Sequence, residues 1–421
     1  MSRVRYKWSS PAFTVVAAVV VVVVGVLAFP SSASAQQPHF GYSPHFCQIW
    51  NTAPSANRAS GDSVLGAITA ISSSDMWSVG SSFDGTDRHT LAERWTGGTW
   101  NIVATPDGSQ PNNFLTAVDS KGAGNVWAVG FSASANPFDP QSTTLVESWS
   151  GTSWSVVDSP NPTMPGGGES TNELFGVGVA GPGDVWVVGK TADFSNSQSL
   201  ILHWDGVQWT DMSTPDEGDG GWLTAIEVVA PDDIWAVGFD IVNFIQVNLI
   251  KHWDGQHWTN VEAPNVGSFV NQLQGISATS KDDVWAVGYH LAIFGVDQVN
   301  QTSVLHWNGS AWSVVDSPNR SQKNNELFGI VGTAAGSAWA VGFWDNGVQI
   351  LSLIEHWDGF AWNVISGSPN PSDAINQLTG VVSVGPNEAW AAGQDAAGIS
   401  FETFVAHLAC PGMVGTRTIT R

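Results

Sequence analysis

Five asparagines in this 421-residue sequence recur in one local context, each standing two residues before a leucine. Their amides, and the Glu or Gln side chain that follows four of them, can hydrogen-bond sugar hydroxyls or a peptide backbone. We therefore treat them as candidate ligand contacts. The alternative is that each asparagine caps its own loop by bonding backbone amides. The candidates are Asn113, Asn172, Asn271, Asn325 and Asn376.

Two tryptophans, Trp222 and Trp344, stand outside the positions at which tryptophan recurs regularly in this chain. Both fall on the face of the fold where we expect the variable loops, and an exposed indole ring there can stack on a pyranose ring. The alternative for both is ordinary packing among loop aromatics. Together with the five asparagines, they complete the predicted ligand-binding set.

Residues suited to catalysis are scarce by comparison. Asp119 and Glu227 are the carboxylates expected near the centre of the fold, but the equivalent repeat positions hold Gly178, Ser277 and Val331. The sequence contains neither a G-x-S-x-G nor an H-E-x-x-H motif. We expect no catalytic residue. The alternative is a polysaccharide hydrolase or lyase that uses the two carboxylates.

The repeated histidines and an acidic loop are residue types that can bind metals, but neither has the arrangement of a metal site. Equivalent histidines of different repeats lie too far apart to share a zinc ion, whose ligands bind at about 2 Å. The acidic loop 216–220 lacks the ligand spacing of an EF-hand. We therefore expect neither a metal nor a cofactor. The repeated histidines are His203, His252, His306, His356 and His407.

A sequence repeat must position all of these side chains. A V-W-A-V-G-like core occurs seven times, and a pair of tryptophans five residues apart follows each of the first six copies. These positions account for 19 of the 23 tryptophans, so most of the tryptophan is structural. The core tryptophans are Trp77, Trp127, Trp186, Trp235, Trp285, Trp339 and Trp390.

Each repeat predicts four short strands, because its apolar runs are rich in β-branched and aromatic residues and are bounded by turn formers. The Asp-Gly or Asn-Gly that lies between most of the paired tryptophans signals a tight hairpin. Four strands per repeat of about 50 residues predict an all-β, seven-bladed β-propeller over residues 45–412. The connections between second and third strands, and between consecutive repeats, vary most. We expect the face that they form, the loop face, to bind the ligand.

The two ends of the repeat region complement each other. Residues 404–408 match a third strand that no fourth strand follows, and residues 49–54 match an orphan fourth strand. We expect the N-terminal strand to complete the last blade and close the ring. The only cysteines, Cys47 and Cys410, flank this hairpin. In an exported protein they should form a disulfide.

The sequence resembles secreted bacterial propeller proteins built from D-V-W-A-V-G and H-W-[DN]-G-x-x-W repeats, over residues 45–412. The W-D-G-x-x-W hairpin is also similar to part of the Asp-box of sialidase-type propellers. It lacks one residue and the leading serine of that motif, and the kelch glycine doublet is missing. The resemblance carries over no catalytic residue. The few arginines and tyrosines after residue 35 argue against sialidase chemistry.

Residues 1–35 have the pattern of a secretory signal peptide. Arg3, Arg5 and Lys7 precede an apolar run over 12–29, and Ala33-Ser34-Ala35 offers a cleavage site. An uncleaved membrane anchor facing outside is the alternative. Residues 413–421 are left as a C-terminal tail.

The charge balance narrows the choice of partners. A formal charge of −23 and a pI near 4.4 argue against nucleic acid, because binding phosphates requires a basic surface. We expect a secreted, monomeric, non-catalytic protein that binds a glycan or an extracellular protein on the loop face. An envelope scaffold without a small ligand is the further alternative.

Overall fold

The computed structural model describes residues 49–409 except 59–60, 137–140, 165–169, 334–335, 386 and 399. The chain divides into two units, Met1–His45 and Phe46–Arg421, and only the second is described below. The expected signal segment, the predicted disulfide of Cys47 with Cys410 and the tail lie outside the described residues. In the described part, no helix is long and apolar enough to cross a membrane.

The described elements are 28 β-strands, four for each sequence repeat. The first strands are β2 (Ser63–Ser72), β6 (Asn112–Ser120), β10 (Thr171–Gly181), β14 (Trp222–Ala230), β18 (Asn271–Ser280), β22 (Asn325–Thr333) and β26 (Ile375–Gly385). The second strands are β3 (Asp75–Phe83), β7 (Val126–Ala133), β11 (Asp184–Ala192), β15 (Asp233–Val242), β19 (Asp283–Phe294), β23 (Ser337–Asp345) and β27 (Glu388–Ala397). The third strands are β4 (Arg88–Trp95), β8 (Ser142–Trp149), β12 (Ser197–Trp204), β16 (Ile245–Trp253), β20 (Asp297–Trp307), β24 (Ile350–Trp357) and β28 (Ser400–Ala409). The fourth strands are β5 (Trp100–Val103), β9 (Trp154–Val156), β13 (Trp209–Asp211), β17 (Trp258–Asn260), β21 (Trp312–Val315), β25 (Trp362–Val364) and β1 (Trp50–Ala53).

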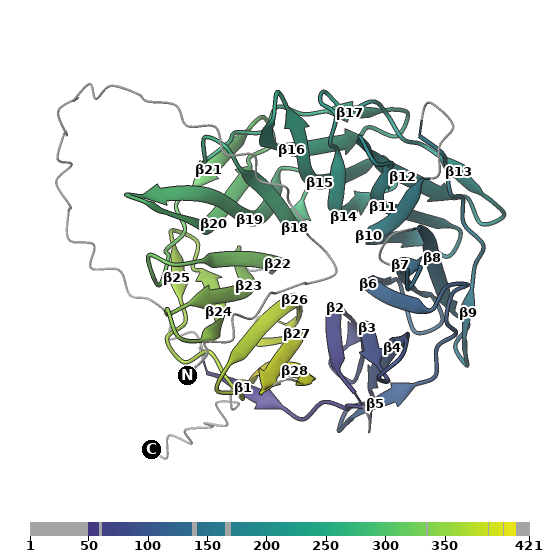
Figure 1. The fold of residues 1–421 in the computed structure, drawn as a ribbon, viewed down its shortest axis with the longest axis horizontal. Helices are drawn as coiled ribbons and strands as arrows, with labels where there is room; N and C mark the ends of the chain where they lie inside the picture. Colours follow the sequence, from purple (N-terminus) through teal and green to yellow (C-terminus); the bar gives the residue numbers. More distant parts are fainter. Residues whose placement is uncertain are drawn as a thin grey trace, which may run out of the picture. The chain divides into compact units, whose positions relative to one another are not determined.

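Within each repeat the strands pair antiparallel in chain order, as in the sheet β10-β11-β12-β13. Two larger sheets each contain two such groups, joined by a single parallel pairing, Arg88 with Asn112 and Ile350 with Ile375. Each first strand contacts the first strand of the next repeat, and β26 contacts β2, so the groups form a closed ring (Figure 1). This all-β arrangement is a β-propeller.

The predicted closure by the N-terminal strand is confirmed. Strand β1 pairs antiparallel with β28, with Trp50 opposite Leu408 and Ala53 opposite Val405. Trp50 is buried and its ring lies 5.4 Å from that of Trp339 in an edge-to-face contact. The first and last strands along the chain, β1 and β28, therefore share one sheet and one hydrophobic core.

The repeated tryptophans form the seams between neighbouring groups of strands. The core Trp186 packs against Trp253 and Trp258 of the next repeat, with ring centroids 5.0 and 5.7 Å apart. The paired tryptophans face each other across a hairpin, as Trp204 does with Trp209. Such aromatic contacts add about 0.5–1.5 kcal/mol each beyond the burial of their surface. Most of the tryptophan is thus structural, as the spacing predicts.

Candidate functional site

The predicted asparagines lie at the start of the first strands, where they hold the loops that lead into those strands. Asn271 Oδ1 accepts hydrogen bonds from the backbone N–H groups of Val266 (2.9 Å) and Gly267 (2.7 Å). Its Nδ2 donates to the carbonyl oxygens of Gln246 (3.3 Å) and Gly267 (2.8 Å). This side chain is buried and its donor and acceptor atoms are used by the protein itself.

The other four asparagines are also buried. No hydrogen bond described here connects one of the five asparagine side chains to another. Asn113, Asn325 and Asn376 each accept one backbone N–H and donate to two backbone carbonyls. Asn172 accepts a hydrogen bond from Thr191 Oγ1 at 2.8 Å. The loop-capping alternative accounts for the backbone contacts of Asn113, Asn325 and Asn376, whereas the contact of Asn172 is with a side chain on β11.

Replacing Asn271 with alanine is expected to lower the free energy of unfolding by about 2 kcal/mol, because buried N–H groups lose their acceptor. Equilibrium urea unfolding measures this change. The control is Asn101→Ala at an exposed position, where a change within about 0.5 kcal/mol is expected. Equal effects at the two positions would contradict the capping role.

The two loop-face tryptophans are partly buried against other side chains. The Trp222 ring is stacked on Phe175, with centroids 5.8 Å apart, and Lys190 Nζ lies 3.6 Å from its centroid. The Trp344 ring packs on the core of its repeat, and Arg320 Cζ lies 4.7 Å from its centroid. Contacts within the protein therefore occupy much of both rings, as the packing alternative expects.

A partly buried ion pair lies beside Trp222. Lys190 Nζ is 3.2 Å from Glu173 Oε2, and Ser142 donates to Glu173 Oε1 at 3.0 Å. Burial lowers the pKa of Lys190, and the Glu173 carboxylate opposes that shift. Glu173, one of the polar residues that follow the asparagines, thus joins two neighbouring repeats.

The two central carboxylates bond backbone groups of the next repeat. Asp119 Oδ2 accepts the N–H of Val179 at 2.8 Å, and Glu227 is hydrogen-bonded to the backbone of Ala278. Burial raises the pKa of Glu227 to about 8, with a further contribution from the Asp119 charge. Burial raises the pKa of Asp119 as well. Both side chains tie neighbouring first strands together.

The repeated histidines contact the core tryptophan of their own repeat. His203 stacks on Trp186 with centroids 4.0 Å apart, and its Nε2 lies 2.9 Å from Asp184 Oδ1. Within the described residues, no three His, Cys, Asp or Glu side chains are grouped closely enough to hold a metal ion. In the acidic loop 216–220, Asp216 forms an ion pair with Lys251 at 2.9 Å.

Sequence reasoning missed an exposed apolar surface on the loop face. Two neighbouring hairpins, β15–β16 and β19–β20, flank the loop 265–270. Gln246 N–H donates to Phe269 O at 3.0 Å on one side, and Leu291 N–H donates to Val270 O at 2.9 Å on the other. The exposed apolar side chains of these three segments form what we call the hairpin surface. It consists of Ile241, Phe244, Ile245, Val266, Phe269, Ile293, Phe294 and Val296.

One of the two hairpins that carry the hairpin surface is unusually long. Strands β19 and β20 have 12 and 11 residues and reach further from the ring than their neighbours (Figure 1). Phe244 and Val296, at the two tips, are 101% and 99% exposed. The signal in the sequence was the length and apolar content of the connections between β15 and β16 and between β19 and β20. Nothing in either segment alone shows that the two hairpins are neighbours and place their apolar residues together.

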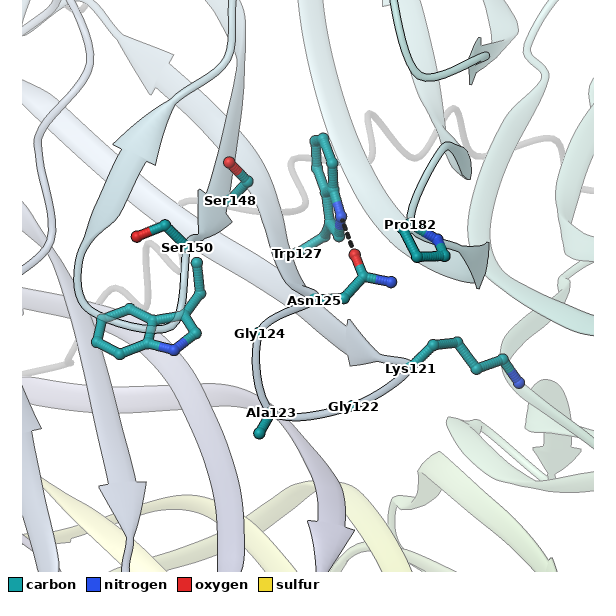
Figure 2. Close-up of a pocket in the computed structure, with 10 residues that line it drawn as sticks. Lys121, Gly122, Ala123, Gly124, Asn125, Trp127, Ser148, Ser150 and Pro182 are labelled. Atoms are coloured by element: carbon teal, nitrogen blue, oxygen red, sulfur yellow. Dashed lines mark hydrogen bonds between the residues drawn. The ribbon is translucent and has the colours of Figure 1, made fainter.

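The opposite face carries a hollow of about 500 Å³ between two repeats. Loop 121–125, Ser148, Ser150 and Pro182 surround it, and the core Trp127 forms part of its wall (Figure 2). In Figure 2 the indole N–H of Trp127 points at Asn125, to which it donates a hydrogen bond of 2.9 Å. This hollow lies on the face formed by the short turns, where we expected no ligand.

Comparison with known proteins bears on the fold of this chain and not on its function. No family model matches the chain, and no curated protein matches it significantly. Among solved structures, the polysaccharide lyase Uly1 has a TM-score of 0.51 at 12% identity, over 85% of this chain and 91% of that one. YCF48 from Cyanidioschyzon merolae has a TM-score of 0.48 at 16% identity, over 86% and 98%.

A third neighbour is Sqt1 from Chaetomium thermophilum, solved with the N-terminus of the ribosomal protein L10. Its TM-score is 0.45 at 12% identity, over 80% of this chain and 84% of that one. Of these three, the likeness to Uly1, with a TM-score above 0.5, supports the all-β propeller architecture. At such identities a structural likeness concerns the fold alone, because propellers carry unrelated functions.

Proposed function

We propose that this chain is an exported, non-catalytic, seven-bladed β-propeller that binds a protein partner through the hairpin surface. Seven groups of four strands around the ring support the blade count. The charged and apolar pattern of residues 1–35 supports export, and a Cys47–Cys410 disulfide is part of the same proposal. The hairpin surface supports a protein partner, because contiguous exposed apolar patches mark interaction sites.

The observation that carries the proposal is the conformation of Phe244. It occupies the turn between β15 and β16 with a φ of 65°, and its side chain is 101% exposed. A bulky residue in this left-handed conformation is strained, and turns of this kind favour glycine. The neighbouring hairpin has glycine at such a position, Gly295 with a φ of 66°. A strained residue with a solvent-exposed phenyl ring points to a function for the ring.

The chemistry of the surface indicates the kind of segment it binds. Aromatic and aliphatic side chains on adjacent hairpins suit a peptide segment with apolar anchors. Exposed carboxylates on the same hairpins and the loops beside them favour basic residues next to those anchors. These carboxylates belong to Glu217, Asp219 and Glu262, and to Asp297, which also lies 3.6 Å from Lys323 Nζ.

The test uses two matched sets of short peptides with the same apolar anchors, flanked by lysine in one set and by glutamate in the other. Fluorescence anisotropy should show binding of the lysine-flanked set. Phe244→Gly should weaken that binding roughly tenfold or more, as the loss of an exposed aromatic anchor would. The same change should raise the free energy of unfolding by about 1 kcal/mol, because it relieves the strained φ. Loss of binding therefore cannot come from unfolding.

The matched control is Phe360→Ser, which removes an equally exposed ring (92%) from a turn on the opposite face. It should leave peptide binding unchanged. Equal binding of both peptide sets, or equal weakening by the two variants, would overturn the proposal. So would Phe244-dependent binding to phosphatidylcholine vesicles in place of peptides, or binding to a glycan array. Turnover of a polysaccharide that is lost in Glu227→Gln would favour the hydrolase or lyase alternative.

A further inference from the structure

One repeat lacks the side chain that covers the core tryptophan elsewhere. In strand register, Ser148 stands opposite Trp127 where His203 stands opposite Trp186. Five core tryptophans carry a histidine ring, with centroids 4.0, 4.2, 4.1, 4.2 and 3.7 Å apart. On the sixth, Trp77, the Arg94 guanidinium carbon lies 5.1 Å from the ring centroid. Among the described residues, Trp127 alone has a serine at this place.

The missing ring leaves space beside Trp127. The hollow of about 500 Å³ described above lies against Ser148 and Trp127 (Figure 2). Trp127 is the most exposed of the seven core tryptophans, at 6%, although all seven are buried. The place that an imidazole occupies in five other repeats is therefore part of the hollow in this one.

The polar groups of the hollow match those that hold the histidines. Asp184 Oδ1 accepts hydrogen bonds from Trp186 Nε1 and from His203 Nε2, both at 2.9 Å. Asn125 Oδ1 accepts the bond from Trp127 Nε1 at 2.9 Å, which leaves the second place at that oxygen for a ligand. Asn125 Nδ2 is buried and has no hydrogen-bond partner among the described residues.

We propose that this hollow binds a neutral imidazole ring, either a free small molecule or the histidine side chain of a partner. The ring stacks on Trp127, and its N–H donates to Asn125 Oδ1. The neutral form is favoured because Asn125 carries no charge where five other repeats have Asp or Glu, and Lys121 lines the same hollow. The site lies on the face opposite the hairpin surface, so the inference does not depend on the proposed function.

The test is a titration of the whole protein with imidazole at a pH above its pKa, followed by the indole N–H resonance of Trp127. The expected result is a saturable shift of that resonance and a melting temperature that rises with imidazole concentration. Ser148→His should abolish both responses, because its own ring fills the hollow. That variant should also melt at a higher temperature than the parent protein without imidazole.

A second variant keeps the inference falsifiable if Ser148→His folds poorly. His203→Ser opens the same space beside Trp186, where the carboxylate of Asp184 remains. It should gain an imidazole site that, unlike the natural one, also binds at a pH where imidazole is protonated. Titration with a histidine-containing peptide distinguishes a partner side chain from a free ligand. No shift at Trp127, or the same shift in Ser148→His, would overturn the inference.

Discussion

Replacing Lys251 with leucine is expected to lower the free energy of unfolding by about 3–5 kcal/mol, because it leaves a buried carboxylate without its counter-charge. Lys251 and Asp216 are 0% and 1% exposed, and Lys251 Nζ lies 2.9 Å from Asp216 Oδ1. The ammonium group also donates to Asn260 Oδ1 at 2.9 Å and to the carbonyl oxygens of Thr214 and Pro215, both at 3.3 Å. Equilibrium urea unfolding measures the loss.

The chain itself supplies the control for this prediction. At the same two places in the following repeat stand Leu305 and Asn265, and Asn265 Oδ1 accepts the N–H of Asn248 at 2.9 Å. The double variant Lys251→Leu with Asp216→Asn copies this uncharged arrangement. It should recover most of the stability lost in the single variant, because no buried charge is left unpaired. A single variant as stable as the parent protein would show that the ion pair contributes nothing.

The protein is expected to lose stability as the pH rises from about 5 to 9, the reverse of acid denaturation. Burial raises the pKa of Glu93 to about 7, that of Glu147 to about 9 and that of Glu355 to about 8. The folded state therefore holds protons that the unfolded state releases above its ordinary pKa near 4.5. Each group lowers the free energy of unfolding by up to about 1.4 kcal/mol per pH unit, until its folded-state pKa is passed.

Glu147 should account for the largest share of this pH dependence. Its side chain is fully buried, neither carboxyl oxygen has a hydrogen-bond partner among the described residues, and the Asp107 charge adds to the shift. Glu147→Gln should match the parent protein at pH 5 and exceed its stability at pH 9, because an amide has no proton to release. Thermal melts of both proteins across this range measure the difference. Identical slopes, or parent stability that rises with pH, would contradict the prediction.

These two predictions concern one position of the repeat. Lys251, Glu147 and Glu355 all precede the histidine position of the third strand, and each packs toward the preceding repeat. The sequence shows the residue types at this position but not what lies opposite. Lys251 meets Asp216, whereas Glu147 meets the like charge of Asp107. Removing the charged group is therefore expected to lower stability at Lys251 and to raise it at high pH at Glu147, and this difference follows from the packing between repeats.

The sequence predicted which residues lie at the candidate site, but it did not show what each of them contacts. The five asparagines follow from the spacing of the repeat, and the backbone contacts of four of them match the loop-capping alternative. The spacing also located Trp222 but could not show Phe175 and Lys190 against its ring. Phe175 belongs to the preceding repeat, as does Lys190, and contacts between repeats have no local signature.

The amino-acid sequence by itself determined the strands, their order and the closing strand at Trp50, because tryptophan spacing and Asp-Gly turns act within a single hairpin or between adjacent repeats. Only the tertiary structure decided which surfaces are open. The hairpin surface exists because two hairpins with exposed apolar residues are neighbours, and the hollow at Trp127 exists because Ser148 is too small to cover the ring. The exposure of a side chain depends on which residues pack against it. In a ring of repeats those residues often belong to a neighbouring repeat, so the local sequence does not show them.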